Sequence, residues 1–496
     1  MSTKLEESLD PKDWTAMRGL GHRMLDDAMD YLESVRERPV WQPVPESLKE
    51  AMRAPLPVEG EEASAVYDDF RRGVFPHTMG NIHPRFWGWV IGTGTPFGVL
   101  ADMMAATMNP NVGGANQGPS YVEVQVLTWL KEMLGYPVEA SGILVSGGSM
   151  ANLVGLAVAR NAKAEGDVAQ DGLAAAPRPM VLYASAETHN SVRKAVSLLG
   201  LGRSALREIP VDVVLRIDVG ALRTAIAEDR KAGRYPFCLV GNAGTVNTGA
   251  IDPLTELADI CKAENLWFHV DGAFGALAAI APNLQPLVRG MERADSLAFD
   301  LHKWMYMPYE VGCALVRWPE KHRATFASPA DYLAHLTRGL AVAEPIWFSD
   351  YGVQLSRGFR ALKVWMSLRE HGVRKYGRMV QQNCEQAKFL ERLVKENEEL
   401  ALMAPVSLNI VCFRFAPAGI DDERLDQVNE EILYALQESG AAVPSSTVLG
   451  GRFALRICIC NHRTRSEDLE FLVREVIRRG HAIAAEPARS AGDRHD

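Results

Sequence analysis

The amino-acid sequence predicts an α/β protein with a mostly parallel sheet, and three observations support that prediction. From about residue 85 to residue 320, short apolar runs alternate with segments of helical periodicity. The apolar runs are unbroken, which is typical of strands that are buried on both faces. The helical segments fall between consecutive runs, as the crossover helices of a parallel sheet do.

The first predicted element is an amphipathic helix over residues 14–38. Apolar side chains recur there at helical spacing, and the proline-rich connection RPVWQPVPES follows. Because this segment carries little core of its own, we expect residues 1–84 to form a helical arm that packs on another domain or on a second subunit. The polar start MSTKLEESLDPKDW lacks the apolar core of a secretion signal, and no apolar stretch reaches membrane-spanning length, which predicts a cytoplasmic protein.

Six apolar runs are the predicted strands of a large domain over residues 85–380. In chain order they read GILVSGG, PMVLYAS, FCLVGNAG, LWFHVDGA, SLAFDLHKW and CALVRW. Helices are predicted between them in ANLVGLAVARNAKA, SVRKAVSLLG and LTELADICKAEN. Ligands of such sheets bind at the C-terminal ends of the strands, so the residues that close each run are the candidate site residues.

A smaller α/β domain is predicted over residues 381–496. Its strand candidates are SLNIVCFRF and RFALRICIC, and its helix candidate is DERLDQVNEEILYALQES. Between the two domains, SPADYLAHLTRGLAVAEPIWFSDYG lacks clear periodicity and is predicted to be a long working loop. A helical region that starts with RGFRALKVWMSLREHG follows it.

The composition argues against several classes of partner. The net charge is −9, and no long basic run appears, so we expect a small-molecule substrate and no nucleic acid. The seven cysteines are odd in number, and most of them lie in apolar runs, which favours reduced core cysteines. Cys458 and Cys460 have no matching second pair, so no metal site is predicted.

The first candidate site is a glycine turn between a predicted strand and a predicted helix. Gly147, Gly148 and Ser149 lie at this junction in GILVSGGSMAN. Glycines let the backbone approach an anion, and the N-terminus of a helix offers unpaired N–H groups to a phosphate. Alone the turn is a weak signal, and neither it nor GTGTPFG at 92–98 matches a nucleotide-binding fingerprint.

Three further side chains follow predicted strands. Asp271 in LWFHVDGAFGA is either a cap before a turn or the counter-ion of a protonated ring nitrogen. Lys303, beside His302 in SLAFDLHKW, is either an amine that reaches for solvent or one that forms an imine. His189 in ASAETHNSVRKA is either a satisfied core residue or a ring-stacking one.

The order of glycine turn, histidine, aspartate and lysine resembles that of the group II pyridoxal-phosphate decarboxylases, which include aromatic-L-amino-acid and glutamate decarboxylases. The resemblance runs from HPRFWGW to RFALRICIC, and HVDGAFG and DLHKW are its most specific parts. It implies pyridoxal 5'-phosphate (PLP) as cofactor and PLP fold type I, which is that of aspartate aminotransferase. It also implies an intertwined homodimer with active sites at the subunit boundary.

The resemblance implies a role for each candidate residue. Lys303 would hold the cofactor as an imine, His189 would stack on its ring, and Asp271 would pair with the pyridine nitrogen. The other cofactor contacts would come from Gly147, Gly148, Ser149, His302, and Thr245 in GNAGTVNTG. Tyr332, in SPADYLAH, falls on the mobile loop, where the family's tyrosine returns a proton to the substrate carbon after CO2 has left.

The expected activity is decarboxylation of an L-amino acid to its amine, with the aromatic class favoured. Trp89 is a candidate to face an aromatic substrate, but Asn109 and Asn111 stand where aromatic-specific relatives carry apolar residues, across the dimer. Hydroxylated aromatic, acidic and smaller substrates therefore stay open. Aldehyde synthases on the same scaffold carry phenylalanine in place of Tyr332, so the tyrosine favours decarboxylation. The intact Lys303 argues against a catalytically silent relative.

Overall fold

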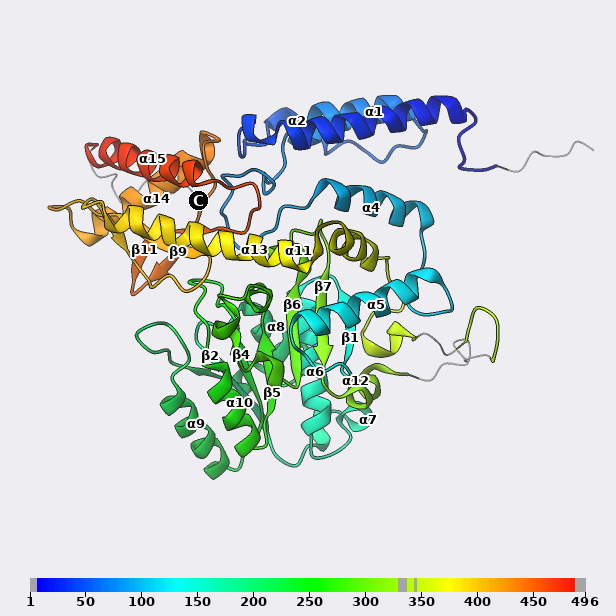
Figure 1. Ribbon diagram of the computed structural model, residues 1–496, viewed down its shortest axis with the longest axis vertical. Coiled ribbons are helices and arrows are strands. Elements are labelled where there is room, and N and C mark those ends of the chain that lie inside the picture. The colour runs from blue at the N-terminus through cyan, green and yellow to red at the C-terminus, as the bar shows by residue number, and fades with distance from the viewer. Residues whose placement is uncertain (1–6, 329–336, 343–345, 487–496) are drawn as a thin grey trace, which may run out of the picture.

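A seven-stranded sheet forms the centre of the molecule in the computed structural model, which describes residues 7–328, 337–342 and 346–486 (Figure 1). Its strand order is β1-β7-β6-β5-β4-β2-β3. Strand β7 is antiparallel to both of its neighbours, and β2 to β6 pair in parallel, which confirms the predicted mostly parallel sheet. The strands are Ser141–Val145 (β1), Met180–Ser185 (β2), Leu206–Ile209 (β3), Tyr235–Asn242 (β4), Trp267–Asp271 (β5), Ser296–Asp300 (β6) and Gly312–Val316 (β7).

The sheet is buried on both faces, as its unbroken apolar strands predict. In β2, Tyr183 belongs to the larger hydrophobic cluster, whereas Leu182 and Ala184 belong to a second cluster, on the opposite face of the sheet. The helices of this part of the chain are Pro96–Met108 (α4), Gly118–Met133 (α5), Gly148–Lys163 (α6), Val168–Asp171 (α7), Asn190–Leu198 (α8), Val219–Lys231 (α9), Leu254–Ala263 (α10), Leu301–Trp304 (α11) and Pro319–Phe326 (α12). The sequence analysis missed β3 and α9, because both are rich in charged residues and lie at one edge of the sheet.

The C-terminal part holds a four-stranded antiparallel sheet of order β10-β11-β9-β8. Its elements are Leu400–Leu402 (β8), Ile410–Phe415 (β9), Asp422–Glu438 (α14), Ser445–Leu449 (β10), Arg452–Cys458 (β11) and Ser466–Ala484 (α15). The long helix α13, Ala361–Lys395, joins this part to the large sheet and is interrupted at Gly372, whose φ is 70°. The limit predicted at residue 380 falls inside α13, and the domain boundaries stay a prediction.

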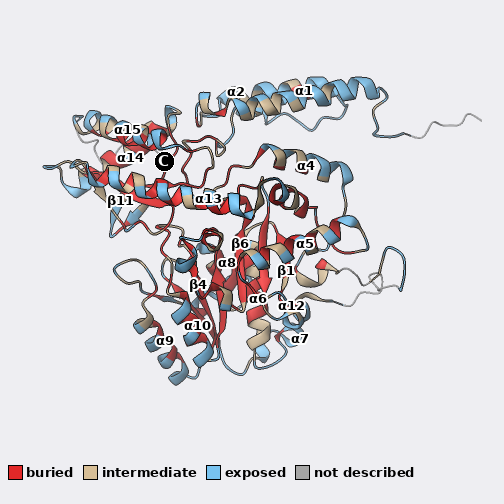
Figure 2. Cartoon of the chain, in the orientation of Figure 1, coloured by how far each residue is buried: buried red, intermediate tan, exposed pale blue. Residues whose placement is uncertain are grey.

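The N-terminal arm consists of α1 (Trp14–Glu33), α2 (Glu46–Ala51) and α3 (Ala63–Asp69). Helix α1 ends at Glu33, five residues before the predicted end, and a short turn at Val35–Glu37 follows. None of its 20 residues is buried, and Figure 2 shows it in pale blue and tan at the top of the view, above α4. Asp27 ties α1 to the following segment, because it accepts a hydrogen bond from Tyr67 at 2.7 Å and pairs with Arg71 at 3.0 Å.

A buried ion pair between Arg357 and Glu123 lies near the end of β1 and holds neighbouring elements together. The side chains of Arg357 and Glu123 are both fully buried, and Arg357 Nη2 lies 2.5 Å from Glu123 Oε1. Arg357 also donates to the carbonyl groups of Val112 and Leu144, each at 2.7 Å. One guanidinium therefore fixes α5, β1 and the loop after α4 relative to each other.

All seven cysteines are buried with free thiols, which confirms their predicted place in the core. Within the described ranges, no helix combines the length and the apolar character needed to cross a membrane.

Candidate active site

The carboxyl edge of the large sheet brings the predicted cofactor residues together. Asp271 is the last residue of β5, and Lys303 lies three residues after β6 in the short helix α11. The glycine turn, His189 and Thr245 follow β1, β2 and β4. The strands run parallel, so their ends meet at one edge, as the fold class predicts.

Lys303 is a half-buried amine beside the carboxylate of Asp300. Its Nζ lies 2.9 Å from Asp300 Oδ2. Burial alone would lower the pKa of Lys303, but the charge and hydrogen bond of Asp300 and the charge of Asp271 outweigh burial and raise it. The sequence analysis did not assign Asp300, although it opens the DLHKW block. Asp300 is 1% exposed, and its Oδ1 has no hydrogen-bond partner in the described part of the chain.

The glycine turn is shaped to receive an anion. Helix α6 begins at Gly148, and the first backbone hydrogen bond of the helix joins Ala151 N–H to Gly147 O at 2.9 Å. Among the described residues, no acceptor binds the N–H groups of Gly148, Ser149 and Met150, so they remain available to a ligand. A Cβ atom at Gly148 would lie 2.8 Å from Asp300 Oδ2, so a larger residue would clash there.

His302 presents a hydrogen-bond donor near this turn. Its Nδ1 accepts from Val311 N–H at 3.1 Å, so the neutral ring carries its proton on Nε2. Burial lowers the pKa of His302, which favours the neutral ring. Its Cε1 would lie 3.1 Å from a Cβ atom at Gly147, and a Cβ at Gly92 would lie 2.0 Å from His302 O. The segment GTGTPFG therefore packs against the lysine turn, a role that the sequence analysis missed.

His189 caps helix α8, and its ring is held at one nitrogen. Nδ1 accepts from Ser191 N–H at 3.2 Å and lies 2.8 Å from Ser191 Oγ. Burial lowers the pKa of His189, so the neutral form is favoured. Thr245 closes its own turn, because its Oγ1 accepts from Ala250 N–H at 3.2 Å and lies 3.3 Å from Thr248 Oγ1.

Asn152, on α6, connects Asp271 to the support of His189. Its Nδ2 donates to Asp271 Oδ2 at 2.9 Å and to Ser191 Oγ at 3.0 Å. Asp271 Oδ1 also accepts from Ala273 N–H at 3.1 Å. The side-chain amide of Asn152 thus holds Asp271 directly and His189 through Ser191. These are the two residues expected to contact the cofactor ring.

The hydrogen bond that Asn152 forms through its side-chain oxygen fixes which ring nitrogen of His269 carries the proton. Asn152 Oδ1 accepts from His269 Nε2 at 2.9 Å, so His269 Nδ1 is the acceptor for Ser296 Oγ at 2.7 Å. Trp267 Nε1 donates to the same Ser296 oxygen at 2.8 Å. Burial lowers the pKa of His269 to about 4, so the ring is neutral. The sequence analysis missed this chain, whose only signals were Asn152 in SGGSMAN and His269 in HVDG.

The three predicted substrate residues are all exposed. Trp89 is 56% exposed, and its carbonyl accepts from Arg456 Nη1 at 2.9 Å, while Arg456 Nε donates to Val246 O at 3.0 Å, next to Thr245. Asn109 ends α4 in the left-handed conformation and is exposed. Asn111 is also exposed.

The side chain of Asn111 joins its own loop to the segment at Arg357. Its Oδ1 accepts from the N–H groups of Gly113 and Arg357, both at 3.0 Å. No described contact joins Asn109 or Asn111 to Lys303, so their substrate roles stay predictions. Tyr332 lies outside the described residues.

The comparisons with known proteins agree with this geometry. The family model described as pyridoxal-dependent decarboxylase conserved domain matches residues 45–416. The chain is 35% identical to an aromatic-L-amino-acid decarboxylase of Bacillus atrophaeus over 91% of this chain and 93% of that protein. It is 28% identical to a phenylacetaldehyde synthase of Petunia hybrida, over 92% of each chain. The crystal structure of Oryza sativa TDC with PLP and tryptamine superposes with a TM-score of 0.89 at 27% identity, covering 96% of this chain and 100% of that one.

The site also fits the cofactor that the family name implies. Lys303 supplies a half-buried amine for an aldehyde, and Asp271 supplies a hydrogen-bonded carboxylate for a ring nitrogen. The free N–H groups of Gly148 and Ser149 supply donors for a phosphate. Together with the matched family model, this arrangement shows that the chain belongs to the pyridoxal-dependent decarboxylase family and is a PLP-dependent carboxy-lyase.

Proposed function

We propose that this enzyme decarboxylates an aromatic L-amino acid to the corresponding amine and CO2. The observation that carries the proposal is the nearly full-length similarity to the aromatic-L-amino-acid decarboxylase of Bacillus atrophaeus. The exposed ring of Trp89, whose backbone is linked to the Thr245 turn through Arg456, supports an aromatic substrate.

Each site residue has a task in this reaction. Bound PLP supplies a conjugated ring that takes up the electron pair left behind when the carboxylate departs as CO2. Asp271, held by Asn152 and by Ala273 N–H, would keep a proton on the ring nitrogen. Lys303 would attach the aldehyde through its amine, and the ring of His189 would cover the cofactor face.

The proton that replaces CO2 needs a donor at the substrate carbon. We assign this task to Tyr332 because of its place in SPADYLAH. Its hydroxyl group would give up a proton that a phenylalanine cannot supply. Replacing Tyr332 by Phe should therefore lower amine formation and raise aldehyde and ammonia formation, measured with the same substrate.

A product assay tests the reaction type. Purified enzyme with PLP is incubated with aromatic, acidic and aliphatic L-amino acids, and CO2, amine, ammonia and aldehyde are measured together. CO2 with an equal amount of amine, from aromatic substrates, would support the proposal. CO2 with aldehyde and ammonia would instead support an aldehyde synthase, the alternative that the similarity to the Petunia hybrida phenylacetaldehyde synthase favours.

The same panel tests the substrate class. Asn109 and Asn111 keep acidic and smaller amino acids open as alternatives, because these amides replace apolar residues at the predicted pocket. If an acidic amino acid gave the highest kcat/KM, the aromatic proposal would be wrong. Preference for a hydroxylated aromatic acid over its unsubstituted analogue would point to an amide that binds the hydroxyl group.

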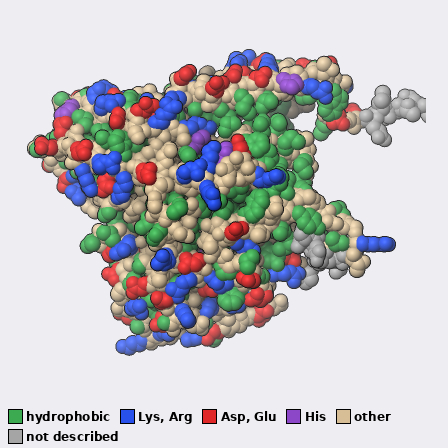
Figure 3. All heavy atoms as spheres, viewed as in Figure 1, with side chains coloured by type: hydrophobic (Ala, Val, Ile, Leu, Met, Phe, Trp, Pro, Cys, Tyr) green, Lys and Arg blue, Asp and Glu red, His purple; other side chains and the backbone are tan. Residues whose placement is uncertain are grey.

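We further propose a homodimer with α1 and α4 at its interface. Trp14, Met17 and Met24 of α1 are 62%, 39% and 45% exposed, and Met103 and Met104 of α4 are 50% and 46% exposed. Figure 3 shows hydrophobic side chains gathered over α4 and below α1. Exposed apolar patches of this kind mark protein interfaces, and a second copy would cover them.

Sedimentation of a charged variant tests the dimer. Met103→Glu combined with Met104→Glu should convert the dimer to a monomer, whereas Val213→Glu, on a loop residue that is 96% exposed, should leave it intact. A wild-type protein that sediments as a monomer at micromolar concentration would overturn the proposal.

We also propose that the enzyme is cytoplasmic. Its seven free, buried thiols suit a reducing compartment. Fractionation of the source cells should recover the activity with cytoplasmic markers, and recovery with secreted proteins would overturn this proposal.

A further inference from the structure

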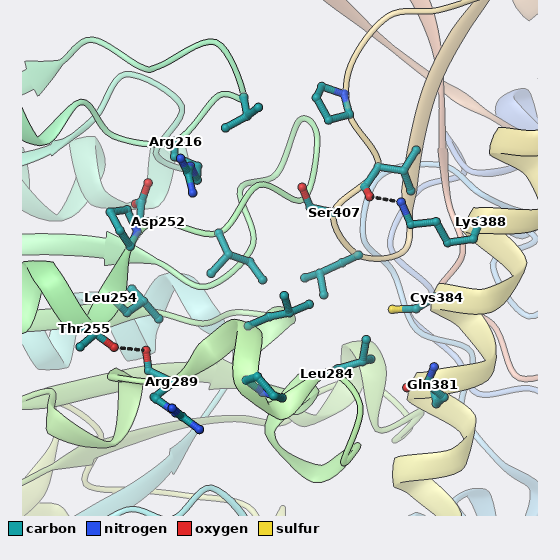
Figure 4. Close-up of a pocket in the computed structure, with 18 of the residues that line it drawn as sticks. Arg216, Asp252, Leu254, Thr255, Leu284, Arg289, Gln381, Cys384, Lys388 and Ser407 are labelled. Atoms are coloured by element: carbon teal, nitrogen blue, oxygen red, sulfur yellow. Dashed lines mark hydrogen bonds between the residues drawn. The ribbon is translucent and has the colours of Figure 1, made fainter. Parts of the chain in front are cut away.

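A second cavity lies between the large sheet and the C-terminal part of the chain, away from the cofactor residues (Figure 4). Its volume is about 1200 Å³, more than the roughly 300–1,000 Å³ of typical ligand pockets. Its walls come mainly from residues 251–256 after β4, residues 284–289, residues 381–392 of α13 and residues 405–408 between β8 and β9. None of the predicted cofactor or substrate residues lines it.

The inner surface of this cavity is apolar. Leu254, Leu284 and Leu408 are buried members of the main hydrophobic core, and each lines the cavity. Cys384 lies on the α13 side, with its sulfur directed toward the hollow in Figure 4. Burial raises the pKa of Cys384 to about 12, so the thiol is neutral and acts as apolar wall.

The acidic side chains of the wall already have hydrogen-bond or ion-pair partners. Asp259 pairs with Arg293 at 2.7 Å, and Glu256 lies 3.7 Å from Arg223. The other two wall carboxylates are also hydrogen-bonded, Asp252 by Ile217 and Asn242 and Glu385 by Gln381. The wall therefore offers no unpaired carboxylate to attract a cation.

Two cationic side chains of the wall, both exposed to solvent, have no carboxylate partner in the described part of the chain, and the guanidinium of Arg392 lies 5.6 Å from the ring centroid of Phe389. Lys388 binds Glu391 and Arg216 binds Asp212, but no described residue forms an ion pair or a side-chain hydrogen bond with Arg289 or Arg392. Arg289 lies on the wall built by the large domain, whereas Arg392 lies on α13. The uncompensated charge of the cavity is thus positive and comes from two sides.

One buried acceptor of the wall is also unsatisfied. Gln381 Oε1 is buried and has no hydrogen-bond partner in the part of the chain that the structure describes, while its Nε2 donates to Glu385 at 3.0 Å. Figure 4 places Gln381 beside the cavity on α13. A buried acceptor without a donor costs free energy, which a ligand N–H or O–H would recover.

We propose that this cavity binds a small organic anion that carries an apolar body and a hydrogen-bond donor. The oxyanion would lie between Arg289 and Arg392, since guanidinium groups bind carboxylate and phosphate oxygens in pairs. The apolar body would cover Leu254, Leu284 and Leu408, and the donor would reach Gln381 Oε1.

The walls of the cavity are connected to the cofactor site through hydrogen bonds. On the sheet side, Asp252 Oδ2 accepts from Asn242 N–H and Nδ2, both at 2.8 Å, and Asn242 Oδ1 accepts from Thr188 Oγ1 at 2.9 Å. Thr188 directly precedes His189. A ligand that fixes the loop at Asp252 therefore fixes the residue before the ring-stacking histidine.

The α13 wall has an equivalent connection. Asn383, next to Cys384, accepts from Trp304 Nε1 at 3.0 Å and from Tyr306 OH at 2.7 Å. Trp304 directly follows Lys303. Through these two connections an anion bound in the cavity would act on the geometry of the cofactor lysine and histidine, and it would tighten PLP binding.

Binding of anilinonaphthalene sulfonate to the holoenzyme tests the site, because this fluorescent probe has an oxyanion, an apolar body and an N–H donor. Arg289→Gln combined with Arg392→Gln should weaken probe binding at least tenfold. Ser407→Trp, which fills the cavity from its loop, should do the same. The control, Arg203→Gln combined with Arg452→Gln, removes two arginines outside the cavity and should bind as wild type does. Equal binding by all four proteins would overturn the proposal.

Competition defines the ligand chemistry. Naphthoate and naphthyl phosphate should displace the probe, and the stronger of the two identifies a carboxylate or a phosphate as the preferred oxyanion. Displacement by naphthyl methanol at the same concentration would overturn the anion assignment, as would loss of binding in Ser407→Trp alone.

The coupling has its own readout. Saturating probe should slow PLP release from diluted holoenzyme about fivefold or more, followed by the visible absorption of the cofactor. The double arginine variant should release PLP at one rate with and without probe. An unchanged release rate of wild type at saturation would overturn the coupling.

Discussion

Asn152 Nδ2 donates a hydrogen bond to Asp271 Oδ2 at 2.9 Å, and the other N–H of the same amide binds Ser191 Oγ at 3.0 Å. Ser191 in turn lies 2.8 Å from Nδ1 of His189. Asp271 and His189 are the groups assigned to the nitrogen and to the face of the PLP ring. Asn152 therefore links the two residues proposed to contact the cofactor, and we assign it the role of a positioning residue.

Replacing Asn152 by Ala should weaken PLP binding by about 5–150-fold. The variant leaves buried partners of the amide without hydrogen bonds, and such a loss costs about 1–3 kcal/mol. Titration of PLP into apoenzyme, followed by quenching of protein fluorescence, measures the dissociation constant. Asn161→Ala, on the same helix, is the control, because among the described residues the side chain of Asn161 accepts a hydrogen bond from its neighbour Arg160 alone. Equal PLP affinities of wild type and the Asn152 variant would show that the amide does not position the site.

Lys303→Ala should abolish the visible absorption band of the enzyme-bound cofactor and reduce decarboxylation to background. The phosphate contacts proposed for Gly148 and Ser149 would not depend on this amine, so the variant should still bind PLP non-covalently. Lys163→Ala is the matched control, since Lys163 donates to Asn265 on the surface. A persistent imine band in the Lys303 variant would mean that another amine holds the cofactor.

Much of the fold was predictable because it depends on local patterns. All six apolar runs of the large domain form strands, and the three helices predicted between them are present. Each of these strands is buried on both faces, so its sequence is apolar without interruption. Strand β3 lies at the edge of the sheet, and its Arg207 and Glu208 gave no such signal. The antiparallel direction of β7 was not predictable, because an unbroken apolar run carries no signal that distinguishes a parallel from an antiparallel strand.

The candidate site was predictable only where a residue closes a strand. Asp271 and Lys303 stand out because a charged side chain at the end of an apolar run needs either an ionic or hydrogen-bonding partner or a chemical role. Asn152 and Ser296 give no such signal, since a polar residue inside a helix or a strand is ordinary until its partner is known. Their partners lie on other elements, and only the folded chain brings them together.

Asp300→Asn should let Lys303 react with PLP at lower pH. The carboxylate of Asp300 helps to raise the pKa of Lys303, and only the unprotonated amine attacks an aldehyde. The amide keeps a similar shape but removes the charge, so the pKa of Lys303 should fall and the rate of imine formation near neutral pH should rise. Stopped-flow absorption after mixing apoenzyme with PLP, across a pH series, gives the midpoint.

The same variant should bind phosphate more tightly. Asp300 lies against the glycine turn, where its negative charge opposes the phosphate. Inorganic phosphate should therefore compete with PLP at lower concentration in Asp300→Asn than in wild type.

The pH series of imine formation has an outcome that would contradict the first expectation. If the midpoint moved to higher pH in Asp300→Asn, Asp300 would be accepting the proton of Lys303 and not slowing its reaction by raising its pKa.

Acid should destabilise the fold, and His322 should account for part of the loss. This fully buried ring binds Tyr351 O through Nε2 at 2.8 Å, and burial lowers its pKa to about 4. In the unfolded chain the pKa of histidine is about 6.5. Between these two values the unfolded chain binds more protons than the native one, so the stability that the neutral ring contributes is lost as pH falls. Between pH 7 and pH 5 this single group removes about 2 kcal/mol.

The free energy of unfolding in urea, measured for apoenzyme at pH 7 and pH 5, isolates this contribution. His322→Gln should lose about 2 kcal/mol less than wild type over this interval, although it is less stable at pH 7. His22→Gln should follow wild type, because His22 is exposed on α1. Parallel losses in wild type and His322→Gln would mean that the native ring accepts a proton as readily as the unfolded one. The acid sensitivity would then have to come from the other buried histidines, of which His269 lies directly behind the cofactor site.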